Sequence, residues 1–150
     1  MFIREAMVSD IPVLHSIRMS VRENVLLTPA LVTENDYKDH LENLGKGWLC
    51  EADGVATGFA IINCQDSSVW ALFIRPEFEG RGMGRRLQEI MLRCYFENNS
   101  RPVWLTTQKG TRAEKFYLNS GWVKLGTTSQ GEIKFQMTVD SWKRQLPLTN

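Results

Sequence analysis

The chain has 150 residues, of which 43% are apolar and 23% are charged, and its formal net charge at pH 7 is +1. This length and composition predict one globular domain over residues 1–150, and they exclude a disordered or fibrous chain. The near-zero net charge provides no long-range field toward nucleic acid or an acidic membrane, so we expect neither as a partner.

The first third of the chain predicts a strand followed by two helices. Residues 2–6 are typical of a short strand, and Ser9 or Asp10 then caps an amphipathic helix. Thr33 and Asp36 have the spacing of a capping box, which predicts the start of a second, short helix. The apolar face of the first helix is formed by Ile11, Leu14, Ile17 and Val21.

Three strands are expected next. Residues 48–52 and 55–64 flank an Asp-Gly pair, which favours a tight hairpin turn. The run from Val69 to Ile74 is continuously apolar, which indicates a central strand that is buried on both faces.

Helices and strands alternate in the second half. From Gly84 onward, apolar residues recur at helical spacing, and residues 103–107 then form a strand. Thr111 and Glu114 have capping-box spacing, which predicts a helix over 111–120. The apolar face of the helix after Gly84 is formed by Leu87, Ile90, Met91 and Cys94.

Two strands are predicted to close the domain, at residues 122–127 and 133–139. The second strand alternates strictly, so one face is expected to contact solvent, and as an exposed sheet edge it would allow a homodimer. Residues 141–150 are expected to fray. The element order β-α-α-β-β-β-α-β-α-β-β predicts a mixed α/β domain.

The cysteines and the apolar segments indicate an intracellular protein. Cys50, Cys64 and Cys94 are widely spaced and include no CxxC pair, so we expect neither a disulfide framework nor a metal site. The N-terminal residues are charged where a secretory signal would be apolar, and no apolar run approaches the roughly 20 residues of a membrane-spanning helix. We therefore expect a cytoplasmic protein.

A glycine-rich loop, "RPEFEGRGMGRRL", separates the central strand from the next helix. Glycines before a helix N-terminus let an anion approach the unpaired amides, so Gly80, Gly82 and Gly84 favour a phosphate or pyrophosphate, with Arg81 and Arg85 beside it. The spacing matches neither a P-loop nor a dinucleotide loop, which argues against nucleotide hydrolysis and hydride transfer. The alternative is that the glycines only shape a turn.

The longer segment "LFIRPEFEGRGMGRRL" resembles the acyl-CoA-binding motif of the GNAT superfamily of acyl-CoA N-acyltransferases. Gly82 and Gly84 match the motif, and Glu79 stands where Gln or Arg is usual. The segment "GTRAEKFYLNSGW" resembles the second motif of the superfamily, with Gly110 at the place of a frequent Asn. The residues that match the second motif are Ala113, Phe116, Tyr117, Gly121 and Trp122.

This resemblance implies a fold, a co-substrate and a site. The fold would be a mixed, mostly antiparallel sheet of about six or seven strands flanked by about four helices. The co-substrate would be acetyl-CoA, and Tyr117 would act as general acid beside the departing sulfur. The implied cofactor-binding residues are Leu72, Phe73, Ile74, Glu79, Gly80, Arg81, Gly82, Met83, Gly84 and Arg85.

The acceptor would be the primary amine of a small molecule, an amino acid or a peptide. An amine with a pKa of about 10.4 must lose a proton before it attacks, at a cost of about 4.6 kcal/mol at pH 7. Glu23, Glu51 and Glu132 are all conceivable bases, and no motif singles one out. We expect the acceptor beside Glu23, Asn24 and Trp70.

Three functions remain open on the sequence alone. The first is acetyl transfer from acetyl-CoA to an amine by direct attack in a ternary complex. The second is a non-catalytic module that binds acyl-CoA as a regulatory ligand. The third, a nucleic-acid patch at "RGMGRR", has only local charge and few aromatic residues to support it.

Overall fold

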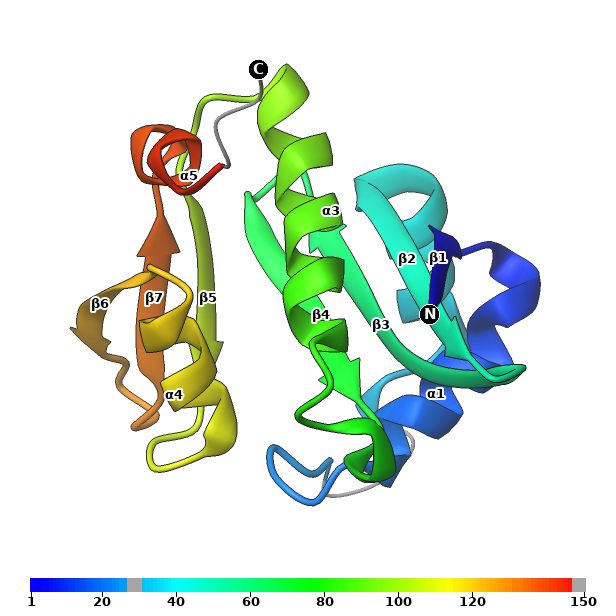
Figure 1. Ribbon diagram of the computed structural model, residues 1–150. Helices are drawn as coiled ribbons and strands as arrows, with labels where there is room; N and C mark the ends of the chain where they lie inside the picture. The colour runs from blue at the N-terminus through cyan, green and yellow to red at the C-terminus, as the bar shows by residue number, and fades with distance from the viewer. Residues whose placement is uncertain (27–30, 147–150) are drawn as a thin grey trace.

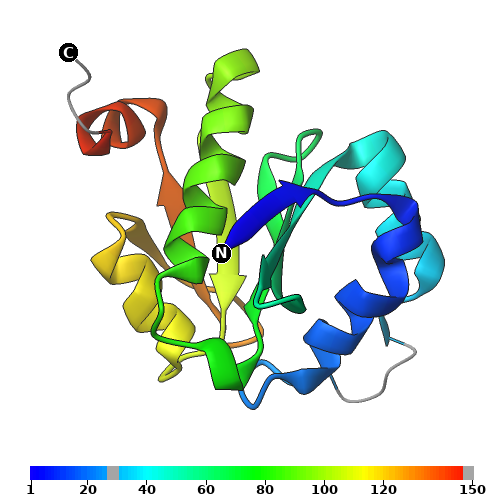
Figure 2. The same cartoon turned by 45° about the vertical axis from the view of Figure 1, so that its right-hand side comes forward.

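The structure is a computed structural model that describes residues 1–26 and 31–146. It contains a seven-stranded sheet in the order β1-β2-β3-β4-β5-β7-β6, with helices on both faces (Figures 1 and 2). Neighbouring strands are antiparallel except β4 and β5, which are parallel. The predicted mixed and mostly antiparallel α/β fold is confirmed.

The order of the predicted elements is also confirmed, with one helix added at the end. The elements are β1 (Phe2–Glu5), α1 (Ile11–Ser20), α2 (Glu34–Asp39), β2 (Gly45–Ala52), β3 (Val55–Asn63), β4 (Ser68–Ile74), α3 (Met83–Asn98), β5 (Val103–Thr107), α4 (Arg112–Asn119), β6 (Val123–Thr127), β7 (Ile133–Met137) and α5 (Val139–Gln145). In the described part of the chain, no helix has the length and apolar character needed to cross a membrane.

Alternation along the strands divides the core into two layers. Leu49 and Phe59 point to the face covered by α1 and α2, whereas their neighbours Trp48 and Ala60 point to the face covered by α3. Successive side chains of a strand point to opposite faces, so continuously apolar strands fill both layers at once. Figure 2 shows α1 and α3 on opposite sides of the strands.

Local turn and cap signals are reproduced closely. Asp53 and Gly54 both have positive φ, at 53° and 76°, as the tight β2–β3 hairpin turn requires. At the start of α2 the Thr33 hydroxyl accepts a hydrogen bond from the Asp36 amide, and the Asp36 carboxylate accepts one from the Thr33 amide. The predicted capping box is therefore present.

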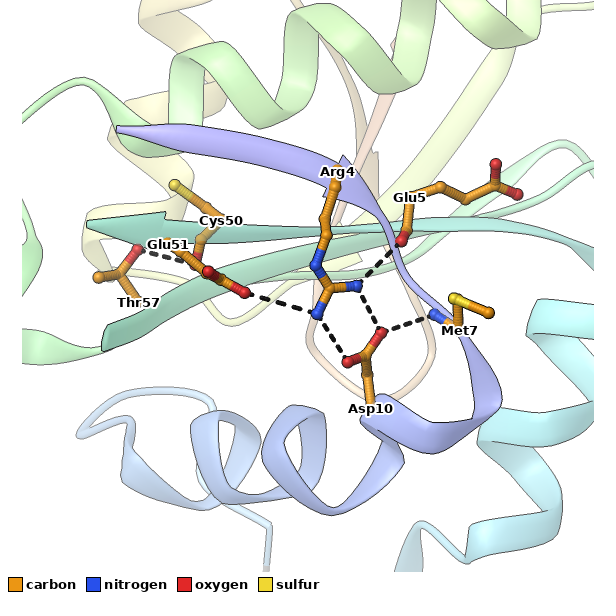
Figure 3. A network of polar contacts seen from close by, with 7 residues as sticks. All are labelled: Arg4, Glu5, Met7, Asp10, Cys50, Glu51 and Thr57. Carbon is orange, nitrogen blue, oxygen red and sulfur yellow. Dashed lines mark hydrogen bonds and ion pairs between the residues drawn. The ribbon is translucent and has the colours of Figure 1, made fainter. Parts of the chain in front are cut away.

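The start of α1 differs from the prediction. Neither Ser9 nor Asp10 caps the helix with its side chain, because both belong to a short 3-10 turn that precedes it. The Asp10 carboxylate instead accepts a hydrogen bond from the Met7 amide, and both its oxygens lie 2.8 Å from nitrogens of Arg4 on β1 (Figure 3). The Arg4 guanidinium lowers the pKa of Asp10, and this contact joins β1 to α1.

Two expectations about the C-terminal segment are wrong. The strand β7 lies between β5 and β6, so it is not a sheet edge; β6 occupies the edge, and all of its residues are exposed. Residues 141–145 form part of helix α5 rather than fraying, because Thr138 caps the Ser141 amide and Trp142 packs into the core. Residues 147–150 of the predicted frayed segment lie outside the described residues. The predicted homodimer stays a prediction.

Candidate active site

The strands β4 and β5 pair at a single register position, Ser68 with Trp104. Farther along β4, the edge of Leu72–Ile74 that faces away from β3 has no strand partner among the described residues. Most of β4 is therefore half-buried, with Ser68 and Ala71 as the buried exceptions, and the prediction of burial on both faces is wrong. The unpaired edge leaves backbone groups available to an extended ligand.

A cavity of about 420 Å³ lies against this edge, and we call it the first cavity. Its wall is formed by β4, the glycine-rich loop, the first turns of α4 and the segment after α1. Of the residues predicted from the sequence, Trp70 and Arg81 are absent from this wall. Those present are Glu23, Asn24, Leu72, Phe73, Ile74, Glu79, Gly80, Gly82, Met83, Gly84, Arg85 and Tyr117.

The start of α3 leaves backbone amides exposed to the first cavity. Threonine side chains cap α2, α4 and α5. The residue before the first turn of α3 is instead Gly82, which has φ of +84° and provides no side-chain cap. The first amide that donates to a carbonyl of the same helix end is that of Arg86, which donates to the Gly82 carbonyl. The amides of Met83, Gly84 and Arg85 therefore lack intrahelical acceptors. Such amides and the helix dipole favour an anion at this position.

Arginines of the loop region have different surroundings. Arg81 stacks over the ring of Phe78, with 5.1 Å between the guanidinium carbon and the ring centroid, whereas Arg85 lines the cavity. Glu79 forms an ion pair with Arg112 on α4, at 3.1 Å between Nε and Oε2. This cation balances the charge of the carboxylate that replaces the usual Gln or Arg beside the expected pyrophosphate.

Tyr117 projects from α4 into the same wall. Its side chain is buried, and its ring packs against those of Phe116, Trp122 and Phe135 at centroid distances of 5.2 to 5.8 Å. Burial raises the pKa of Tyr117, so the phenol stays protonated at neutral pH. A neutral phenol fixed by its neighbours can donate a hydrogen bond into the cavity.

The helix that carries Tyr117 has defined ends. The Thr111 hydroxyl accepts a hydrogen bond from the Glu114 amide, while the Glu114 carboxylate accepts one from Gly110 rather than completing the predicted capping box with Thr111. Gly121 ends the helix with φ of +85°, and the Trp122 amide bonds back to the Tyr117 carbonyl. These contacts hold α4, and with it Tyr117, against the sheet.

A second cavity of about 280 Å³ shares five wall residues with the first: Asn24, Leu72, Phe73, Ala113 and Tyr117. Arg18 of α1 and Glu132, which precedes β7, also line it. Trp70, predicted near the acceptor, lines this cavity and stacks on His40 with ring centroids 3.9 Å apart. Tyr117 is therefore accessible from both cavities.

The segment after α1 connects the two halves of the site. The Glu23 carboxylate accepts a hydrogen bond from the Arg112 amide at 3.0 Å, and the Asn24 side-chain carbonyl accepts one from the Gln108 amide at 3.2 Å. Glu23 and Asn24, which were predicted to lie beside the amine substrate, thus hold the loop before α4 in place and also line the first cavity.

The three conceivable bases are separated by the structure. Glu23 lines the first cavity and Glu132 lines the second. Glu51 lies on β2 within 3.5 Å of Arg4 and lines neither cavity (Figure 3). The histidines are also absent from both cavity walls: His15 bonds to the Tyr37 hydroxyl, and His40 bonds to the Asp36 carbonyl.

Two arginines of the site were missed by sequence reasoning. Arg112 is the first residue of α4, as the Thr111 cap signal indicated, but its contact with Glu79 of the glycine-rich loop is non-local and has no signal in the sequence. Arg18 follows Ile11 and Leu14 by seven and four residues, so it continues the buried face of α1. A charged residue in such a position is a signal for a cavity beneath the helix.

Together these groups can bind an extended, phosphorylated thioester and a second reactant at one tyrosine. The exposed amides are available to an anion, the β4 edge is available to an extended chain, and Tyr117 lines the second cavity as well as the first. This arrangement suits group transfer between two bound molecules.

Comparisons with known proteins agree with this geometry. The sequence matches the family described as an acetyltransferase (GNAT) domain over residues 26–138. A comparison with curated proteins gave no match.

Solved structures share the fold at low sequence identity. A ribosomal-protein-alanine N-acetyltransferase from Brucella melitensis has a TM-score of 0.75 at 20% identity, covering 93% of this chain and 100% of that chain. The PaiA N-acetyltransferase from Thermoplasma acidophilum, solved in complex with coenzyme A, has a TM-score of 0.76 at 11% identity, with coverages of 91% and 98%. An N-acetyltransferase from Staphylococcus aureus has a TM-score of 0.76 at 14% identity, with coverages of 91% and 97%. At these identities the likeness shows the fold alone.

Proposed function

The chain belongs to the GNAT acetyltransferase family, and from this premise we propose that it transfers an acetyl group from acetyl-CoA to a primary amine. The transfer is direct, with both substrates bound at once. The observation that carries this proposal is the first cavity, whose wall combines the uncapped start of α3, the unpaired edge of β4 and Tyr117.

The residues of the first cavity fit acetyl-CoA. The amides of Met83, Gly84 and Arg85 would hold the pyrophosphate, and the backbone of Leu72–Ile74 would bond the pantetheine arm as an added strand. Bound in this way, acetyl-CoA would supply an activated acyl group, with Tyr117 available to its thioester.

The chemistry forms a C–N bond and breaks the C–S bond and one N–H bond. The neutral amine attacks the thioester carbonyl, the C–S bond breaks to release the coenzyme A thiolate, and the nitrogen gives up one proton to solvent as it becomes an amide. Tyr117 donates a hydrogen bond to the sulfur as negative charge develops on it. Because burial raises the pKa of Tyr117, full proton transfer to the thiolate is more unfavourable than for an ordinary tyrosine, and stabilisation by hydrogen bonding is its main role.

The amine must reach the thioester in its neutral form. Of the conceivable bases, Glu132 shares the second cavity with Tyr117, which makes it the carboxylate best situated to receive the ammonium proton. Glu23 is a weaker candidate, because its carboxylate already accepts a hydrogen bond from the Arg112 amide.

The test is isothermal titration with acetyl-CoA, followed by measurement of coenzyme A release in the presence of amines. A Cβ at Gly84 would lie 3.6 Å from Phe116 and 3.9 Å from Ile74, both in the wall of the first cavity, at ordinary contact distance. Gly84→Ala should therefore bind acetyl-CoA as the wild type does, whereas Gly84→Trp should fill the cavity. We expect micromolar binding by the wild type and by Gly84→Ala, and its loss in Gly84→Trp.

Two other results would contradict the proposal in different ways. Binding that survives Gly84→Trp would place acetyl-CoA elsewhere. Binding without coenzyme A release for any amine would favour the non-catalytic, acyl-CoA-binding module instead.

A further inference from the structure

The second cavity is lined by a cation, Arg18, that has no ion-pair partner among the described residues. Arg18 is half-buried, and its Nη1 atom is fully buried without a hydrogen-bond partner among the described residues. Arg18 forms no ion pair within residues 1–26 and 31–146. A buried guanidinium nitrogen that lacks an acceptor is unfavourable, and the Arg18 side chain lines the cavity wall. An anionic ligand in the cavity would therefore balance the charge of this guanidinium.

The position of this guanidinium is defined by an aromatic ring. Its carbon lies 4.2 Å from the ring centroid of Phe73, a residue of β4 that lines both cavities. Burial lowers the pKa of Arg18, as expected for a charge removed from water without a carboxylate to balance it. Stacking fixes the planar group while leaving its edge N–H donors available for a bidentate contact with a carboxylate.

Among the described residues, the wall of the same cavity contains one carboxylate, that of Glu132. The hydrogen bonds of Glu132 involve its backbone: its amide donates to the Thr128 hydroxyl, and its carbonyl accepts from the Thr128 amide. Glu132 forms no ion pair with any described residue. With Arg18 as the sole cation and Glu132 as the sole anion in the wall given by the described residues, the cavity is balanced for a ligand with one charge of each sign.

Size and charge together indicate the class of acceptor. The volume of about 280 Å³ lies near the lower end of the range of ligand pockets, about 300–1,000 Å³. A doubly charged phosphate would meet one cation and be repelled by Glu132, whereas a carboxylate has the single charge that one guanidinium balances.

We propose that the acceptor is a free amino acid or a similar amine that carries a carboxylate, that Arg18 binds this carboxylate, and that Glu132 attracts the ammonium group. The inference rests on the proposed function, since it identifies the acceptor of that transfer. It places the carboxylate over Phe73 and leaves the amine in the part of the cavity that contains Glu132 and Tyr117.

The experiment compares acceptors that differ only in the carboxylate. The protein complexed with coenzyme A is titrated with each common amino acid and with matched amines, such as phenylalanine against phenethylamine and lysine against cadaverine. The same pairs are then assayed for coenzyme A release from acetyl-CoA. Arg18→Met removes the charge while keeping an unbranched apolar chain over Phe73, and Arg18→Lys keeps the charge without the planar fork.

The matched control is Arg22→Met, because Arg22 is exposed and lines neither cavity. We expect the wild type and Arg22→Met to bind at least one amino acid better than its matched amine. Arg18→Met should weaken binding of that amino acid by about 10- to 100-fold and leave the matched amine unchanged, with Arg18→Lys between the two.

The outcomes separate this inference from the proposed function. Acetylation of matched amines that equals or exceeds that of amino acids, unaffected by Arg18→Met, would support the transferase and overturn the inference. Binding of an amino acid that depends on Arg18, without coenzyme A release, would support the site and contradict the transferase. Failure of every amino acid to bind, or a preference for phosphoethanolamine over β-alanine, would overturn the carboxylate assignment.

Discussion

At the scale of single residues, the protonation state of Tyr117 decides what it contributes. Its burial among Phe116, Trp122 and Phe135 raises its pKa, which disfavours the phenolate and preserves the hydrogen-bond donor. A buried tyrosine of this kind stabilises developing negative charge without being consumed as an acid. We therefore expect Tyr117 to affect the rate of acetyl transfer and not the binding of acetyl-CoA.

Replacing Tyr117 with Phe tests this role. We expect kcat for acetyl transfer to fall by about 10- to 100-fold, because one hydrogen bond to a charged leaving group is lost. The dissociation constant of acetyl-CoA should stay the same, as measured by isothermal titration. Tyr37→Phe is the matched control, since Tyr37 bonds to His15 and lines neither cavity. An unchanged kcat in Tyr117→Phe would remove the residue from the mechanism.

At the scale of elements, the starts of the helices differ in capping: threonine side chains cap α2, α4 and α5, whereas α3, like α1, has no side-chain cap. Thr33, Thr111 and Thr138 bond to amides in the first turns of α2, α4 and α5. Gly82 leaves the corresponding amides of α3 without a side-chain acceptor. The threonine caps stabilise α2, α4 and α5, whereas the uncapped amides at the start of α3 are available to an anion.

The cap of α4 provides a stability prediction. Thr111→Ala removes the acceptor for the Glu114 amide and should lower the free energy of unfolding by about 1 kcal/mol. For a chain of this size the melting temperature should fall by about 2–4 °C, as calorimetry would report. Thr111→Ser keeps the acceptor oxygen and should remain close to the wild type. Equal losses in both variants would show that the threonine methyl group, and not the cap, provides the stability.

At the scale of the whole molecule, two of the three buried tyrosines, Tyr37 and Tyr117, make stability sensitive to alkali. Burial raises the pKa of Tyr37 to about 12 and raises that of Tyr117 as well. Both tyrosines titrate near 10 in the unfolded chain. Their stabilising contribution is therefore complete below about pH 10 and is lost as pH rises toward the folded-state pKa values, since the unfolded chain releases its protons first.

This linkage is measurable by urea unfolding at a series of pH values. Between about pH 10 and 12 the free energy of unfolding should decrease with a slope that is smaller in Tyr37→Phe than in the wild type. Phenolate absorbance should report the ionisation of these two tyrosines only as the chain unfolds. A wild-type slope equal to that of Tyr37→Phe would show that Tyr37 titrates normally in the folded protein.

The sequence by itself determined the features that depend on neighbouring residues. Some features require only a few adjacent residues with fixed geometry, so the residue types at those positions predict them directly. Examples are the Asp53-Gly54 turn, the Thr33 cap and the glycine-rich loop at Gly82. The order of strands and helices follows from the same local periodicities. For this reason the amino-acid sequence alone carries the resemblance to an acetyltransferase.

Only the tertiary structure decided how distant elements meet. The separation of β4 from β5 after Ser68, and the insertion of β7 between β5 and β6, depend on pairings between segments far apart in the chain. The meeting of Arg18 with Phe73 likewise requires α1 to pack on β4, although the strands β2 and β3 lie between them in the sequence. The secondary-structure propensity of a short segment does not predict such contacts, because they arise when faces of helices and strands from distant parts of the chain pack together. The motifs around Tyr117 can be identified from short segments of the sequence, whereas its two cavities form only when distant elements pack together.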